Sequence, residues 1–256
     1  MTGEQATDRT VLRISGADRV AFLQGIVTND LHKLAQGPVY AALLTPQGKY
    51  LADFILVDEG GAAILLDVKS DLAEGLAQRL AMYKLRADVQ VEPSGLGVQR
   101  GLGPVPEGAV PDPRHPALGW RRYTTEPGLP PSTDWDALRV AHGVPETGVE
   151  LIPNDSFILE LGFERLNGVD HRKGCYVGQE VTARMKHKTV LRKGLARVAV
   201  AGDAEPGTPI ESEDGRAAGV LHSRAGDTAL AYLRFDRAEG AMRAGGATIT
   251  RLPEDA

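Results

Sequence analysis

The stretch Lys173-Gly-Cys-Tyr-Val-Gly-Gln-Glu180 is the part of the sequence on which the interpretation of the fold depends. It holds Cys175, the single cysteine of the chain, two residues after a lysine. Glycine permits tight turns and a close approach of the backbone to a ligand, so we expect Gly174 and Gly178 to shape a loop around the thiol. This concentration of glycine, lysine, glutamine and glutamate around one cysteine indicates a functional segment.

The residues from Gln179 to Met185 favour a helix, which would place Cys175 just before a helix N-terminus. The helix dipole and the charge of Lys173 would then both favour the thiolate form and make the thiol reactive. The alternative is that Cys175 is a small buried apolar residue without a chemical role. The sequence alone leaves both readings open.

A basic run follows the cysteine segment. Between His171 and Lys193 there are seven lysines and arginines and one acid, Glu180, which gives +6 within a chain of net charge −5 and leaves −11 for the rest. Such an asymmetry is typical of a partner or ligand that carries several negative charges. A solvated helix face followed by an exposed strand is the equally weighted alternative.

Composition and spacing exclude several classes of protein. No apolar run approaches the roughly 20 residues of a membrane helix, and residues 1–10 lack the apolar centre of a secretory signal. One cysteine cannot form an internal disulfide, and it predicts a reducing, cytoplasmic compartment. The six histidines show no metal-binding spacing, no nucleotide-binding glycine motif occurs, and the negative net charge with 5% aromatic residues disfavours nucleic-acid binding. We therefore expect no metal site completed by this chain alone.

The order of predicted elements indicates an α+β fold with a β-barrel at the C-terminus. We expect strands at 10–15, 39–44, 50–57 and 63–68, a helix capped by Asp18, and a helix that is capped by Ser70 and runs through Leu85. Residues 92–116 are rich in glycine and proline and predict a loop with a short strand at 97–100, and Ser132 is expected to cap a further segment. Short strands at 195–200, 209–211, 219–222, 229–235 and 247–252 predict a small closed antiparallel barrel.

The cysteine segment resembles the signature of the YgfZ/GcvT folate-binding family, relatives of the glycine-cleavage T-protein. Weaker matches extend the resemblance over most of the chain in the expected order. They are Phe22-Leu-Gln-Gly-Ile-Val-Thr-Asn-Asp30, Thr45-Pro-Gln-Gly-Lys49 with Asp53, the residues Trp135, Leu138, Arg139, Gly143 and Pro145, and the pairs Ile152-Pro153 and Ala183-Arg184. Ala141 departs from the pattern, because T-proteins usually carry a glutamate there that anchors the pterin.

The resemblance implies a ring-like arrangement of α+β subdomains around a cavity for tetrahydrofolate. It places a folate-binding region at residues 1–193, with two intertwined subdomains of which one is centred on 46–115, and the barrel at 194–256. It also implies a role in assembling or maintaining iron–sulfur clusters in client enzymes, including enzymes that modify tRNA. The site residues that it implies are Cys175 and Asp53 for chemistry, with Cys175 as a ligand to a shared cluster, and Trp135, Arg139, Lys173, Gly174, Tyr176, Gly178, Gln179, Glu180 and Arg184 for folate.

Three functions remain open at this point. The first is a folate-binding accessory protein for iron–sulfur cluster assembly, with client enzymes or the assembly machinery as partners. The second is a tetrahydrofolate-dependent aminomethyltransferase in which Asp53 assists transfer of the one-carbon unit. The third is an RNA-binding module that uses the basic run. The cysteine segment favours the first, since T-proteins lack it.

Overall fold

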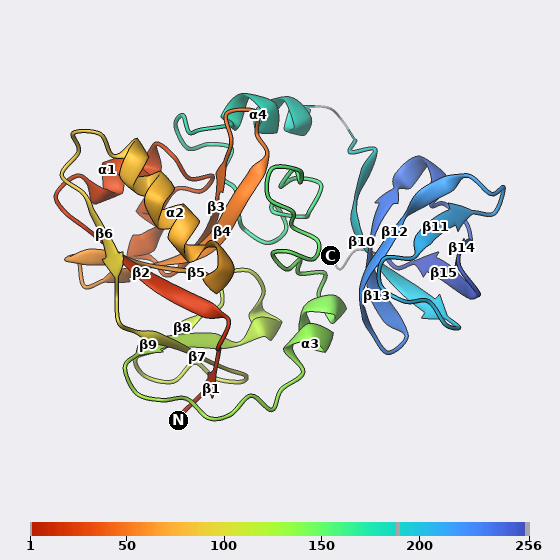
Figure 1. Cartoon of the computed structure of the whole chain (residues 1–256), viewed down its shortest axis with the longest axis horizontal. Coiled ribbons are helices and arrows are strands. Elements are labelled where there is room, and N and C mark those ends of the chain that lie inside the picture. Colours follow the sequence, from red (N-terminus) through yellow and green to blue (C-terminus); the bar gives the residue numbers. More distant parts are fainter. Residues whose placement is uncertain (1, 188–189, 254–256) are drawn as a thin grey trace. The chain divides into compact units, whose positions relative to one another are not determined.

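The computed structural model describes residues 2–187 and 190–253, and it divides the chain into two compact units (Figure 1). The first unit comprises Met1–Thr133 and Glu164–Glu180, and the second comprises Asp134–Phe163 and Val181–Ala256. Lys188 of the basic run lies outside the described residues. The domain boundary between residues 193 and 194 and the ring-like arrangement stay predictions.

The first unit is built on a five-stranded antiparallel sheet with strand order β3-β4-β5-β2-β6. Its β3 is buried along its whole length, as expected for the continuous apolar run Val-Tyr-Ala-Ala-Leu-Leu. The four strands predicted before residue 70 are confirmed, whereas β6 forms in part of the region predicted to be a loop. The strands are β2 (Arg9–Ser15), β3 (Val39–Leu44), β4 (Tyr50–Glu59), β5 (Ala63–Lys69) and β6 (Gln90–Pro93).

Two helices accompany this sheet, α1 (Arg19–Gln24) and α2 (Ser70–Tyr83). The buried residues of α2 are Ala73, Leu76 and Leu80, whose spacing of three and four places them on one stripe, and α2 packs against β2, β5 and β6 (Figure 1). The predicted capping is confirmed only in the position of Asp18, which is the N-cap residue of α1. The Asp18 carboxylate accepts the backbone N–H of Asp88 at 2.8 Å and makes no cap bond to α1, and Ser70 is the first residue of α2 and not its cap.

A second, four-stranded sheet of the first unit has the order β1-β7-β9-β8. The sequence predicted β7 but missed β9, whose Trp-Arg-Arg-Tyr-Thr sequence lacks an apolar alternation. Side chains of both sheets meet in one apolar cluster that includes Val11 and Leu65 of the first sheet and Val98 of the second. The strands are β1 (Glu4–Gln5), β7 (Gly97–Gly101), β8 (Val110–Pro111) and β9 (Trp120–Thr124), and the short 3-10 helices are η1 (Leu31–Ala35) and η2 (Pro116–Leu118).

Buried ion pairs also join the two sheets. The carboxylate of Asp67 on β5 lies 2.6 Å from Arg9 Nε and 2.9 Å from the guanidinium of Arg121 on β9, and Arg121 lies 2.9 Å from Asp112. Burial raises the pKa of Asp67, but the guanidinium groups of Arg9 and Arg121 outweigh it and leave that pKa below its ordinary value. Asp67 therefore stays ionised in the core. Arg121 can be buried in a strand because its guanidinium group forms ion pairs with Asp67 and Asp112.

The second unit contains α3 (Trp135–Ala141), most of α4 (Gln179–His187) and the closed barrel β10-β13-β12-β11-β14-β15 (Figure 1). The helix α3 packs against β12 and β13, and its cap is Asp134, which accepts the N–H of Ala137, instead of the predicted Ser132. The barrel strands are β10 (Lys193–Ala201), β11 (Pro209–Ser212), β12 (Ala217–Ala225), β13 (Thr228–Arg234), β14 (Met242–Ala244) and β15 (Ala247–Arg251), with η3 (Phe235–Arg237) after β13.

The barrel core follows the period of two that strands require. In β10 the residues Ala196, Val198 and Val200 are buried, and the residues between them are more exposed. The predicted α+β class with a C-terminal antiparallel barrel is therefore confirmed, with β14 as the one barrel strand that the sequence missed.

Candidate functional site

The cysteine segment is an irregular stretch of the first unit, between a turn that ends at residue 172 and α4. Its side chains alternate in burial: Lys173 and Tyr176 are each 7% exposed, whereas the thiol of Cys175 is exposed. Val177 packs against the apolar core of the five-stranded sheet. The neighbours of Cys175 thus anchor the backbone while its thiol faces outward. The reading of Cys175 as a buried packing residue is wrong.

Lys173 holds the start of this segment. Its ammonium group donates hydrogen bonds to the backbone carbonyls of Gln24 at 2.8 Å and Val27 at 2.5 Å, at the end of α1, and it lies 5.1 Å from the centre of the Tyr176 ring. Burial lowers the pKa of Lys173 to about 8, although the nearby acids Asp30 and Asp170 oppose that shift. The lysine that was expected to stabilise a Cys175 thiolate therefore has its hydrogen bonds inside the fold.

Gly178 holds the other end. Its φ of +83° lies in the left-handed region, and a Cβ at this position would lie 2.6 Å from the backbone oxygen of Thr45 and 3.1 Å from the Cα of Gly48. The segment therefore packs directly on the turn of the β3–β4 hairpin, which only a glycine permits. Gly174 differs from the expectation, because it has no left-handed φ and a Cβ there would meet nothing within 4 Å.

The turn after α1 binds the chain that leads into the cysteine segment. Thr28 donates to the carbonyl of Gly168 at 2.7 Å, and the Asn29 amide donates to the carbonyl of Asn167 at 2.6 Å. Both side chains are buried, and Lys33 adds an ion pair of 2.7 Å to Asp170. Thr28 and Asn29 were not among the predicted site residues. Their signal was two adjacent polar residues directly after an apolar helix.

Asp53 on β4 is enclosed. Its two carboxylate oxygens accept hydrogen bonds from the hydroxyls of Tyr40 at 2.9 Å and Tyr50 at 2.7 Å, and only 5% of the residue is exposed. Burial and the adjacent Asp53 charge raise the pKa of Tyr40 well above its ordinary value, so this hydroxyl stays a donor. The catalytic role of Asp53 stays a prediction, and the sequence did not identify Tyr40 and Tyr50 as its partners.

Three residues predicted to bind folate belong to the second unit: Trp135, Arg139 and Arg184. Trp135 is half-buried on α3, and Arg184 is exposed on α4. The guanidinium of Arg139 lies 2.7 Å from Asp136, 3.1 Å from Glu150 and 2.5 Å from the Ser223 hydroxyl. Arg139 thus joins α3 to β12 within this unit. The remaining predicted residues, Asp53, Lys173, Gly174, Cys175, Tyr176, Gly178, Gln179 and Glu180, belong to the first unit, and a cavity shared by Asp53 and Trp135 stays a prediction.

Within residues 2–187 and 190–253, no group of three or more His, Cys, Asp or Glu side chains is placed to hold a metal ion. No helix in that part of the chain is long and apolar enough to cross a membrane.

The sequence is similar to curated proteins over most of its length. It is 33% identical over 280 residues to the mitochondrial iron–sulfur cluster assembly factor IBA57 of Mus musculus, and the match covers 91% of this chain and 78% of the relative. The chain belongs to the IBA57 family. The human IBA57 protein is 32% identical with the same coverage, and the Neurospora crassa homologue is 32% identical over 74% of this chain and 51% of its own length.

The barrel and the fold agree with this IBA57 membership. Residues 192–255 match the family model of the CAF17 C-terminal β-barrel domain. The crystal structure of the glycine cleavage system aminomethyltransferase T from Bartonella henselae superposes with a TM-score of 0.76 and 12% identity, covering 98% of this chain and 84% of the other. At that identity the likeness shows the fold alone. The predicted resemblance to iron–sulfur assembly proteins with a T-protein-like fold is confirmed in family and in fold, with relatives that are named IBA57 and not YgfZ.

Proposed function

We propose that this chain is an accessory factor for the assembly or maintenance of iron–sulfur clusters, and that Cys175 carries its chemistry. The observation that supports the proposal is an exposed thiol on a segment fixed at both ends, by the buried Lys173 ammonium and by Gly178 against the hairpin turn. Anchored flanks hold a ligand in place without covering it. The IBA57 relatives are named as iron–sulfur cluster assembly factors, which agrees with this chemistry.

The chemistry that we assign to Cys175 is ligation of a cluster iron shared with another protein. A thiol binds iron as the thiolate, so ligation releases one proton to solvent and leaves the oxidation state of the iron unchanged. Iron–sulfur clusters usually have four thiolate ligands, and this chain has a single cysteine. A partner, either a client enzyme or an assembly protein, therefore supplies the other ligands. The cluster is the cargo of the reaction.

We further propose that the protein binds a reduced folate. The T-protein-like fold and the half-buried indole of Trp135 support this, because a flat pterin needs an aromatic or apolar face. Asp53 is 5% exposed, and each of its carboxylate oxygens accepts a hydrogen bond from a tyrosine, Tyr40 or Tyr50, so burial separates it from a bound ligand. We derive no one-carbon transfer through it, which weakens the aminomethyltransferase alternative.

The proposal about client enzymes rests on the family resemblance, and the proposal about the compartment rests on the single cysteine. Enzymes that modify tRNA are among the clients that we propose, and the cytoplasm is the compartment that we propose. The mouse and human relatives are named as mitochondrial proteins. Fractionation of the source cells therefore decides the compartment.

Complementation of a deletion strain tests the role of Cys175. The strain receives the wild-type chain, Cys175→Ser or Gly174→Ala, and several iron–sulfur enzymes are assayed together with one enzyme that lacks a cluster. We expect Cys175→Ser to restore none of the cluster enzymes. Gly174→Ala is the matched control, because the space around Gly174 is open, and it should restore all of them. Full restoration by Cys175→Ser at wild-type protein levels would refute the assignment.

Calorimetric titration tests folate binding. Tetrahydrofolate is titrated into the purified wild-type chain and into Trp135→Ala, with Val20→Ala, an exposed position of α1, as the control. We expect saturable heat in the wild type and the control and about a fivefold loss of affinity or more in Trp135→Ala, since stacked aromatic faces contribute on the order of 1 kcal/mol. An absence of saturable heat at millimolar ligand would rule out the folate proposal.

A further inference from the structure

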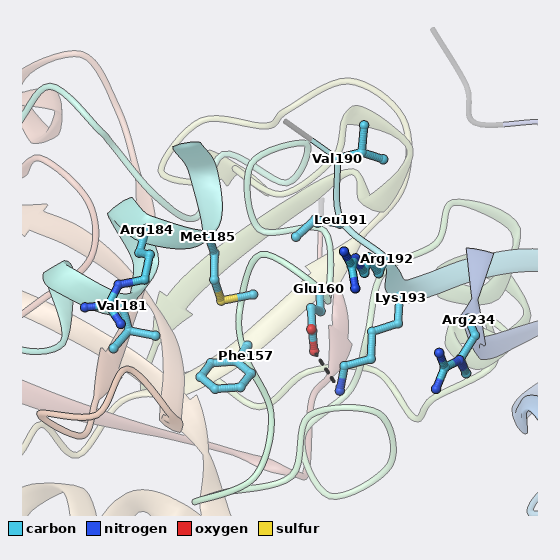
Figure 2. Close-up of a pocket in the computed structure, with 10 residues that line it drawn as sticks. All are labelled: Phe157, Glu160, Val181, Arg184, Met185, Val190, Leu191, Arg192, Lys193 and Arg234. Atoms are coloured by element: carbon cyan, nitrogen blue, oxygen red, sulfur yellow. Dashed lines mark ion pairs between the residues drawn. The ribbon is translucent and has the colours of Figure 1, made fainter. Parts of the chain in front are cut away.

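The second unit contains a hollow that is distinct from the sites proposed above. Cys175 does not line it, and Arg184 is the one predicted folate residue among the described residues that do. Its volume is about 950 Å³, and the described residues that line it all belong to Asp134–Phe163 or Val181–Ala256. Figure 2 shows these residues around the opening between α4, the start of β10 and the loop at residues 157–160. They are Phe157, Glu160, Val181, Arg184, Met185, Val190, Leu191, Arg192, Lys193 and Arg234.

One wall of the hollow is apolar. Val181 and Met185 stand four residues apart and so lie on one face of α4, and the Met185 side chain points toward the Phe157 ring (Figure 2). Val190, on the segment that leads to β10, also lines the hollow and is 77% exposed, which is high for a branched apolar side chain. Methionine and aromatic side chains are enriched where proteins bind partners, and a methionine adapts to different apolar groups.

The rim of the hollow is basic. Among the residues that the structure describes, four cations line it against one acid, Glu160, whose carboxylate lies 3.7 Å from the Lys193 ammonium and 2.5 Å from the Tyr232 hydroxyl. Arg184 and Arg192 are exposed and have no acidic partner among the residues that the structure describes. These two guanidinium groups stand out in a chain whose net charge is −5. Their field at the mouth of an apolar hollow favours a negatively charged ligand that also has an apolar part.

We propose that this hollow binds an acidic segment of a partner protein, which places one apolar side chain against Phe157, Met185 and Val190 and carboxylates against Arg184 and Arg192. An apolar anchor surrounded by complementary charge is the usual energetic arrangement of a protein interface. A single-stranded nucleic acid would need stacking faces for successive bases, and the hollow has one aromatic ring. The proposal concerns partner binding by the second unit and does not depend on cluster or folate binding.

Fluorescence polarisation with the full chain and labelled peptides tests it, in the absence of cluster and folate. The three probes are Glu-Asp-Glu-Leu-Glu-Asp-Glu, the same peptide with alanine in place of leucine, and the neutral Gln-Asn-Gln-Leu-Gln-Asn-Gln; an eight-residue oligouridylate is the fourth. We expect saturable binding of the first peptide and at least tenfold weaker binding of the other three probes, because burial of a leucine and pairing of charges each contribute about that factor. Binding of the first peptide should weaken as salt rises from 50 to 300 mM.

Single variants locate the binding. Arg192→Glu, Arg184→Glu and Val190→Ser should each weaken binding of the acidic leucine peptide by about fivefold or more. Arg243→Glu is the matched control, because Arg243 is an exposed arginine of β14 outside the hollow, and it should leave the affinity unchanged. Equal loss in Arg243→Glu, equal binding of the leucine and alanine peptides, or preference for oligouridylate would each overturn the proposal. Cys175→Ser should bind the peptide as the wild type does, so failure here leaves the cluster assignment unaffected.

Discussion

The ammonium group of Lys173 donates a hydrogen bond of 2.8 Å to the backbone carbonyl oxygen of Gln24, a residue 149 positions earlier in the chain. This contact ties the segment that carries Cys175 to the end of α1. A lysine two residues from a cysteine therefore fixes the backbone around the thiol. The position of the thiol depends on the fold of the first unit, and four predictions follow from that dependence and from the other buried contacts.

Substitution of the two glycines of the segment should have opposite results. Gly178→Ala places a Cβ 2.6 Å from the Thr45 oxygen at a φ of +83°, so we expect it to lower the free energy of unfolding by about 2 kcal/mol or more. Gly174→Ala meets no atom within 4 Å and should change stability by less than about 0.5 kcal/mol. Urea unfolding followed by circular dichroism measures both. Similar values for the two variants would contradict the packing of Gly178 on the hairpin.

The stability of the wild-type protein should rise with pH above 8 through Lys173. Its pKa is lowered from 10.5 to about 8 by burial, so between these values the unfolded chain binds more protons than the folded one. This one group then adds up to about 1.4 kcal/mol of stability per pH unit in that window. Lys173→Met should remove that slope. Urea unfolding of both proteins at pH 7.5, 8.5 and 9.5 measures the difference, in which other titrating groups cancel; parallel slopes would show an ordinary, solvated lysine.

Loss of the buried charge of Asp67 should destabilise the first unit strongly. Asp67→Asn leaves Arg9 and Arg121 without their shared carboxylate, and breaking such a buried pair costs about 3–5 kcal/mol. Because those cations keep the pKa of Asp67 below its ordinary value despite burial, its contribution is complete above about pH 4 and is lost as pH falls through the folded pKa. The gap between wild type and variant should therefore narrow in acid.

The exposed pair of Arg216 and Asp214 is the control for this experiment. Their side chains are 62% and 53% exposed, so Asp214→Asn should change stability by less than about 0.5 kcal/mol. Urea unfolding at pH 7 and pH 3.5 compares the three proteins. If Asp67→Asn and Asp214→Asn lowered the free energy of unfolding equally, the ion pairs between the two sheets would not stabilise the fold.

Substitution of Arg139 should lower the stability of the protein, whether or not this residue contacts a ligand. Arg139→Met leaves the buried Glu150 carboxylate without its cation, which should cost about 3 kcal/mol, and Arg139→Lys should recover part of the loss because it restores the charge but not the planar fork. Thermal unfolding together with tetrahydrofolate titration separates the two roles. Weakened folate binding at unchanged stability would show that Arg139 contacts the ligand directly.

Much of the fold could be predicted because its signals are local. The apolar run of β3 and the period-two burial in β10 follow from the side chains of each strand alone. The single cysteine between glycines, and the helix that begins at Gln179, were equally readable from neighbouring residues. Such patterns report which face of an element is buried, and this depends little on the rest of the chain.

The failures lie where a polar side chain finds a partner far away in the sequence. Asp18 lies at the N-cap position of α1 as predicted, but its carboxylate accepts the N–H of Asp88, 70 residues away. Ser132 was expected to cap the segment beside it, but its hydroxyl donates to Glu4, 128 residues away. β9 was missed because Arg121, polar in the sequence, is buried against Asp67 and Asp112. Buried polar groups need partners, and only the folded chain decides which partners are near.

The sequence by itself thus determined the α+β class, the barrel and the segment that holds the single cysteine. The tertiary structure alone decided that Lys173 binds the end of α1, that Asp53 is enclosed by Tyr40 and Tyr50, and that Cys175 is exposed between buried neighbours. The physical reason is the range of the interactions. The apolar periodicity of an element depends on residues that are neighbours in the sequence. The partner of a buried charge depends on contacts that exist only after the chain has folded.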